Sequence, residues 1–230
     1  MQSDFQITGQ ATQDLSLQQN KVLRNTYLLL ALSMLPTVLG ALVGVRFGFS
    51  LFAGSPFISF LVFMGVAFAF MWGIERTKDS AMGVVLLLGF TFFMGLMLSG
   101  ILRMALGFSN GASLIATAAA GTGAIFFTLA TVATVTKKDF SFLGKFLLIG
   151  VVVVLLAAVA NIFFQIPALS LTISAVTVLI FSAYILYDIS RIVNGGETNY
   201  ITATLAVYLD VYNVFVSLLN LLMAFSGDRD

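Results

Sequence analysis

Two aspartates in the last quarter of the chain combine a reactive side chain with an apolar setting. Asp188 lies in "SAYILYDISRIV" and Asp210 lies in "YLDVYNVFVSLLN", and apolar and aromatic residues dominate both strings. A carboxyl group in a membrane interior is protonated, paired or in contact with water, because an isolated charge there costs several kcal/mol. These residues therefore point to reversible protonation, hydrogen bonding or cation binding.

Three polar residues follow Asp210 at helical spacing. Asn213, Ser217 and Asn220 stand at +3, +7 and +10 from it, which places all four side chains on one helix face. Amides and hydroxyls at such positions are typical of hydrogen bonding between membrane helices. An aspartate needs a further reason, since it carries an ionisation penalty that an amide does not.

Asp188 is the expected partner of Asp210. The short loop "NGGETN" (194–199) makes the two segments antiparallel neighbours, with Asp210 about four to six residues deeper, roughly 6–9 Å along the axes. Direct contact then requires helix tilt, an uneven loop or a bridging water. Repulsion and desolvation would favour a proton shared by the pair, which would make it sensitive to pH. Alternatively, Asp188 is an ordinary acid at a helix end that pairs with Arg191 at +3.

Composition decides the environment of these residues. The 230-residue chain is 60% hydrophobic and 9% charged, whereas about a quarter of the residues in a soluble domain are charged. We therefore predict an integral membrane protein. The net charge of +1 gives no indication of nucleic-acid binding. The absence of cysteine and histidine removes thiolate chemistry and the commonest metal ligand, and no catalytic motif occurs. We expect no cofactor, no metal site and no enzymatic activity.

Seven segments are long and apolar enough to cross a bilayer as helices. Glycine, proline and polar residues separate them, as expected for turns. The sequence therefore predicts an all-α integral membrane fold with seven transmembrane helices. These cover residues 22–45, 57–75, 81–106, 112–136, 141–164, 169–192 and 200–224.

The distribution of lysine and arginine predicts the orientation. Cytoplasmic loops are enriched in these residues, and the side that holds the N-terminus carries eight of them against three on the other side. We therefore expect a cytoplasmic N-terminus and, after seven crossings, a C-terminus outside. Residues 1–20 are polar and are predicted to be a flexible cytoplasmic tail, and residues 21–230 form the transmembrane domain. The eight lysine and arginine residues on the side of the N-terminus are Lys21, Arg24, Arg76, Lys78, Lys137, Lys138, Lys145 and Arg191.

Several strings resemble the Bax inhibitor family, also called the transmembrane Bax-inhibitor-motif family. They are "SAYILYDIS", "LAVYLDVYNVFVSLLNLL" and "KKDFSFLG", together with the seven-span layout. The strings "NKVLRNTYLLL", "VANIFFQIPALSLTISAV" and "GGETNYI" resemble its bacterial branch, which modulates the membrane AAA protease FtsH. The resemblance runs from about residue 20 onward. It implies a multi-pass protein of the bacterial inner membrane whose last helix is central.

The resemblance implies two functions. In the first, the protein binds and restrains FtsH together with the associated HflK and HflC proteins, and is itself a slow substrate through its N-terminal tail. In the alternative, it is a pH-sensitive calcium or cation leak gated by Asp188 and Asp210. A basic latch residue at the end of the second helix belongs to that mechanism, and Arg76 matches it, with Thr77 competing once gaps are allowed. The regulator is our prediction, and the leak is the alternative.

Overall fold

The computed structural model describes residues 2–49 and 55–227, and these residues form seven α-helices and no strand. Each helix contains a segment long and apolar enough to span a membrane. The predicted all-α, seven-span fold is therefore confirmed. The helices are α1 (Gln2–Phe47), α2 (Pro56–Thr77), α3 (Ala81–Leu106), α4 (Gly111–Thr136), α5 (Leu143–Phe164), α6 (Pro167–Val193) and α7 (Tyr200–Phe225).

The helix boundaries follow from local sequence. Pro56 and Pro167 open α2 and α6 at the first helical position, where the missing N–H has no partner to lose. Asn199 caps α7, because its side-chain oxygen accepts a hydrogen bond from the Ile201 N–H at 2.9 Å. Gln165 ends α5 in the left-handed conformation, with φ of 51°. The turns therefore fall where glycine, proline and polar residues predict them.

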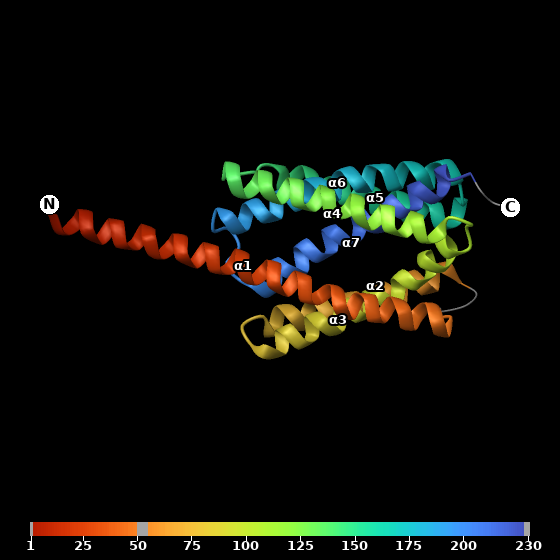
Figure 1. The fold of residues 1–230 in the computed structure, drawn as a ribbon, viewed down its shortest axis with the longest axis horizontal. Helices are drawn as coiled ribbons and strands as arrows, with labels where there is room; N and C mark the ends of the chain where they lie inside the picture. The colour runs from red at the N-terminus through yellow and green to blue at the C-terminus, as the bar shows by residue number, and fades with distance from the viewer. Residues whose placement is uncertain (1, 50–54, 228–230) are drawn as a thin grey trace.

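The first helix begins earlier than the expected span. Residues 2–20, predicted to be a flexible tail, form the first turns of α1, and the outer part of this segment stands beyond the bundle (Figure 1). The helix runs on without a break into the span predicted for 22–45. The flexibility of this segment stays a prediction. Residues 1, 50–54 and 228–230, which include the C-terminal end, lie outside the described residues.

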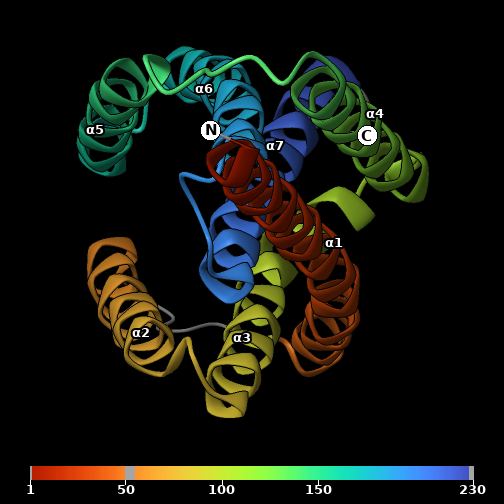
Figure 2. The ribbon, with the colours of Figure 1, turned by 90° about the vertical axis from the view of Figure 1, so that its left-hand side faces the viewer.

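The last helix lies at the centre of the bundle, as expected. Figure 2 shows α7 surrounded by the other helices, and it packs on α1, α2, α3, α4 and α6. Val207, Tyr208, Val214 and Leu219 of α7 are almost completely buried. Any side chain that faces inward from α7 is therefore shielded from lipid.

The closest helix contact joins α1 to α3. A Cβ atom on Gly95 would lie 2.1 Å from the Thr37 carbonyl oxygen, and one on Gly40 would lie 2.1 Å from the Phe92 carbonyl oxygen. Only glycine lets the two backbones approach this closely. The hydroxyl groups of Thr37 and Tyr208 share a hydrogen bond of 2.9 Å, which ties this pair of helices to α7.

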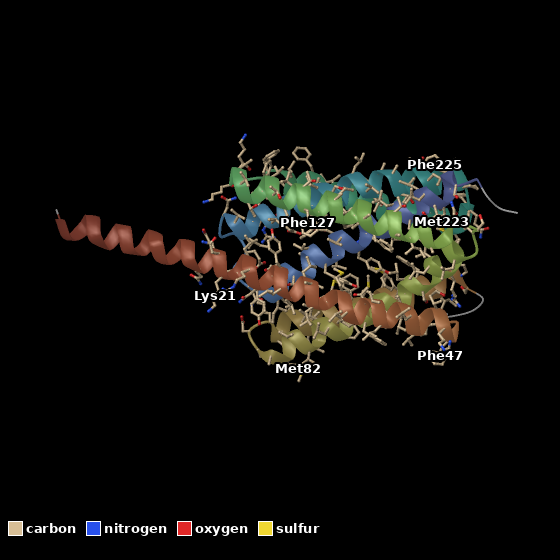
Figure 3. All side chains as sticks on the ribbon, viewed as in Figure 1. Lys21, Phe47, Met82, Phe127, Met223 and Phe225 are labelled. Atoms are coloured by element: carbon tan, nitrogen blue, oxygen red, sulfur yellow. The ribbon has the colours of Figure 1, made fainter. Side chains whose placement is uncertain are left out.

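Apolar side chains cover the outside of the bundle. Phe47, Phe127 and Phe225 are among the most exposed residues (Figure 3). The helix α5 packs mainly on α6 and has a single buried side chain, Leu147. This surface fits the hydrocarbon of a bilayer and leaves polar groups to the interior.

Candidate functional site

The structure brings the two predicted acids together. Asp188 of α6 and Asp210 of α7 are buried, with 9% and 4% of their surfaces exposed, and their carboxyl groups lie within hydrogen-bonding range of one another. Helix α7 runs obliquely across the bundle (Figure 1). This tilt compensates for the greater depth that the sequence assigns to Asp210.

One carboxyl oxygen of the pair, Asp210 Oδ2, is a buried acceptor without a hydrogen-bond partner among the described residues. Carboxylates only accept hydrogen bonds, whereas a protonated carboxyl group also donates one. A single proton held between Asp188 and Asp210 would therefore convert an unfavourable contact between two acceptors into a hydrogen bond.

Asp188 also has a basic neighbour on its own helix. Arg191 Nη1 lies 3.8 Å from Asp188 Oδ1, and Arg191 Nη2 lies 4.0 Å from Glu197 Oε2. The Arg191 guanidinium also stacks on the Tyr187 ring, 5.6 Å from its centroid. Asp188 therefore lies beside both Asp210 and Arg191, two arrangements that the sequence left as alternatives.

Arg76 does not reach the acids in this structure. It is exposed at the end of α2, and its guanidinium lies 5.2 Å from the centroid of the Trp72 ring, one turn earlier. The competing residue, Thr77, donates its hydroxyl proton to the Gly73 carbonyl at 2.8 Å. A latch role for Arg76 stays a prediction, and the basic residue beside the acids here is Arg191.

The polar stripe of α7 lines a cavity of about 430 Å³ between α5, α6 and α7. Asn213, Ser217 and Asn220 all contribute to its wall. Asn213 donates to the Leu209 carbonyl of its own helix at 2.8 Å, so this amide proton is not used to join helices. Asn220 also lines a second cavity of about 350 Å³ nearer the end of α7. The stripe therefore leads along α7, from the acid pair toward the end where α7 terminates.

The wall of the 430 Å³ cavity opposite the stripe also carries polar side chains, which sequence analysis missed. Ser170, Ser174 and Thr177 of α6 face the stripe, together with Asn161 of α5. Spacings of four and three residues place the three hydroxyls on one face of α6, which is the signal that identified the stripe on α7. The cavity therefore offers neutral hydrogen-bonding groups and no charged side chain.

The described residues contain no cluster of three or more histidine, cysteine, aspartate or glutamate side chains placed to hold a metal ion. They do contain a buried carboxyl pair beside an arginine, and an uncharged cavity with several polar side chains begins one turn away along α7. This arrangement can store a proton, and the polar side chains of the cavity can bind water. Fold and site together define a seven-helix membrane protein whose central helix carries half of a buried acid pair.

The chain belongs to the Bax inhibitor family. The family model described as inhibitor of apoptosis-promoting Bax1 matches residues 19–227, so the resemblance seen in the sequence is confirmed. With the seven membrane-spanning helices, the bacterial relatives make the chain a multi-pass inner-membrane protein.

Three relatives illustrate the range of this similarity. The chain is 42% identical over 212 residues to the Escherichia coli K12 protein named modulator of FtsH protease YccA, covering 92% of this chain and 94% of that one. An uncharacterised protein of Neisseria meningitidis serogroup A is 40% identical, covering 91% and 93%. An uncharacterised Pseudomonas aeruginosa protein is 42% identical, covering 90% of each chain.

Proposed function

We propose that this protein is a non-enzymatic regulator that binds and restrains the membrane protease FtsH. The observation that carries the proposal is the 42% identity to the modulator of FtsH protease from Escherichia coli, spread over nearly the full length of both chains. Similarity of this extent favours a shared partner. The HflK and HflC proteins, implied by the family resemblance, are proposed as members of the same complex.

The N-terminal segment is proposed as the handle by which FtsH degrades its own regulator. Residues 2–20 are polar and stand beyond the bundle at the end of α1 (Figure 1). An ATP-driven protease needs an accessible segment before it can extract a membrane protein. This role requires a cytoplasmic N-terminus, which the excess of lysine and arginine at that end favours.

Two measurements test the regulator. Affinity purification of the full chain from native membranes in mild detergent should recover FtsH, HflK and HflC, and their absence would contradict the proposed complex. Removing residues 2–18 should lengthen the half-life in a pulse-chase experiment, but only in cells that contain FtsH. Equal half-lives for the full-length and truncated proteins would contradict the handle, and the binding proposal would then rest on the purification alone.

A reporter fused after Asp230 should be active only outside the cytoplasm.

The acid pair supports a second candidate function, a pH-sensitive leak for calcium or other cations. Asp188 and Asp210 are buried in contact, and the polar stripe lines a cavity that begins one turn from Asp210. Purified protein in liposomes should then pass calcium at a rate that changes between pH 5 and 8. Asp210→Asn keeps the size and the hydrogen bonding but cannot ionise, so it should abolish the pH dependence. An absence of calcium flux would contradict the leak, and the regulator would remain as the proposed function.

A further inference from the structure

A third cavity, of about 440 Å³, lies between α1 and α4 on the far side of α7 from the polar stripe. Its wall is mostly apolar and includes Tyr27 and Met34 of α1, Gly123 of α4 and Val211 of α7. Helices α1 and α4 both pack on α6 and α7, and they meet one another through side chains such as the Tyr27 and Phe126 rings, 6.0 Å apart. We call this space the α1–α4 groove.

One tyrosine beside the groove keeps its hydroxyl group buried. The Tyr27 oxygen is buried and has no hydrogen-bond partner among the described residues. The other two hydroxyls of the wall are occupied, since Thr131 donates to the Phe127 carbonyl at 2.7 Å and Thr134 donates to the Ala130 carbonyl at 2.8 Å. Buried tyrosine hydroxyls usually find a partner. Because almost none of the Tyr27 oxygen is accessible, a molecule in the groove meets the ring of Tyr27 and not its hydroxyl group.

The groove has the length of one leaflet of a bilayer. Because α1 and α4 run in opposite directions, Tyr27 and Thr134 lie near the end that holds the N-terminus, and Met34 and Gly123 lie deeper. From Thr134 to Gly123 the wall spans roughly 16 Å at 1.5 Å per residue. Half of the hydrocarbon core is about 15 Å thick. A lipid acyl chain therefore matches the groove in both chemistry and length.

Positive charges flank the groove at its outer end. Arg24 stands three residues before Tyr27, which is roughly 4.5 Å along the helix. Lys137 and Lys138 follow α4, and Asp139 is the acid nearest to them in sequence. Its carboxylate accepts a hydrogen bond from the Ser141 N–H at 2.8 Å, within the same loop. Basic sites between membrane helices attract anionic lipid headgroups. The positively charged residues that flank the groove are all exposed; they are Lys21 (Figure 3), Arg24, Lys137 and Lys138.

We propose that the α1–α4 groove binds one anionic phospholipid. The phosphate lies among the cations of α1 and of the loop after α4. One acyl chain runs inward along Met34 and Gly123. The proposal concerns lipid binding alone and does not depend on the role in protease regulation.

Gly123 offers a direct way to block the groove. No protein atom other than its own helix backbone and chain neighbours lies within 4 Å of a Cβ atom added there, so Gly123→Leu fills the groove without a clash. Gly65 of α2 is equally open and lies outside the groove, which makes Gly65→Leu the matched control. Native mass spectrometry of the full chain would measure bound dioleoyl phosphatidylglycerol and dioleoyl phosphatidylcholine, supplied at equal concentration.

We expect the natural protein and Gly65→Leu to retain one phosphatidylglycerol in preference to phosphatidylcholine, and Gly123→Leu to lose it. Replacing Lys137 and Lys138 by glutamine should remove the preference between the two lipids. Unchanged retention by Gly123→Leu would overturn the proposal. A dimer of the natural chain that Gly123→Leu converts to monomer would also overturn it, because the occupant would then be a second copy.

Discussion

The α1–α3 contact and the α5–α6–α7 cavity are two opposite solutions to packing helices in a membrane. Gly40 and Gly95 bring the backbones of α1 and α3 together so closely that no side chain fits between them. Around Ser174 and Ser217, in contrast, three helices leave about 430 Å³, with hydroxyl and amide side chains set among apolar ones. Lipid supplies no hydrophobic drive between helices, so close packing must hold the bundle together. The difference suggests that α1–α3 provides stability and that the cavity provides room for movement or for ligands.

The largest effect is expected from Gly95→Leu. The new side chain would start 2.1 Å from the Thr37 carbonyl oxygen, and backbone cannot move aside without separating the helices. We expect a loss of more than about 3 kcal/mol of stability, or failure to fold. The apparent melting temperature in detergent measures this. Gly100→Leu is the control on the same helix, because nothing lies within 4 Å of its Cβ position. Equal losses for both variants would deny that the close contact matters.

A smaller effect is expected from Tyr208→Phe. This substitution removes the hydrogen bond of 2.9 Å to Thr37 but keeps the buried ring. Thr37 still donates to the Ser33 carbonyl at 2.8 Å, so the loss should be about 1 kcal/mol. A double-mutant cycle with Thr37→Val isolates the shared bond, and additive effects of the two substitutions would show that it contributes nothing.

The smallest effect is expected from Ser217→Val. The residue is buried but lines the cavity, so the added carbon atoms have room. We expect a change within about 0.5 kcal/mol, measured by the same melting experiment. A loss comparable to that of Gly95→Leu would mean that the cavity wall is as tightly packed as the α1–α3 contact, and the comparison would fail.

Much of the fold could be predicted because membrane spans leave strong local signals. Hydropathy gave all seven helices, and Pro56, Pro167 and the asparagine at 199 marked where helices begin. The early start of α1 could not be predicted in this way, because residues 2–20 are too polar to read as part of a span.

Sequence analysis singled out the residues of the candidate site but not their geometry. The depth and spacing of Asp188 and Asp210 singled them out, yet their contact depends on the oblique course of α7, which the packing of five other helices determines. Arg76 was assigned toward the acids by resemblance, whereas its guanidinium lies on Trp72. That contact spans only four residues along α2, and attention to local pairs could have found it.

The unbroken course of α1 has a mechanical consequence. Its 46 residues form a rod of roughly 69 Å, and its outer turns are in line with the part that interlocks with α3. Traction applied at residues 2–17 would load the glycine contact in shear, so that its interactions must break together rather than one after another. Extraction from the N-terminus therefore meets its highest resistance at the first step. Once α1 is withdrawn, Tyr208 has lost its Thr37 partner.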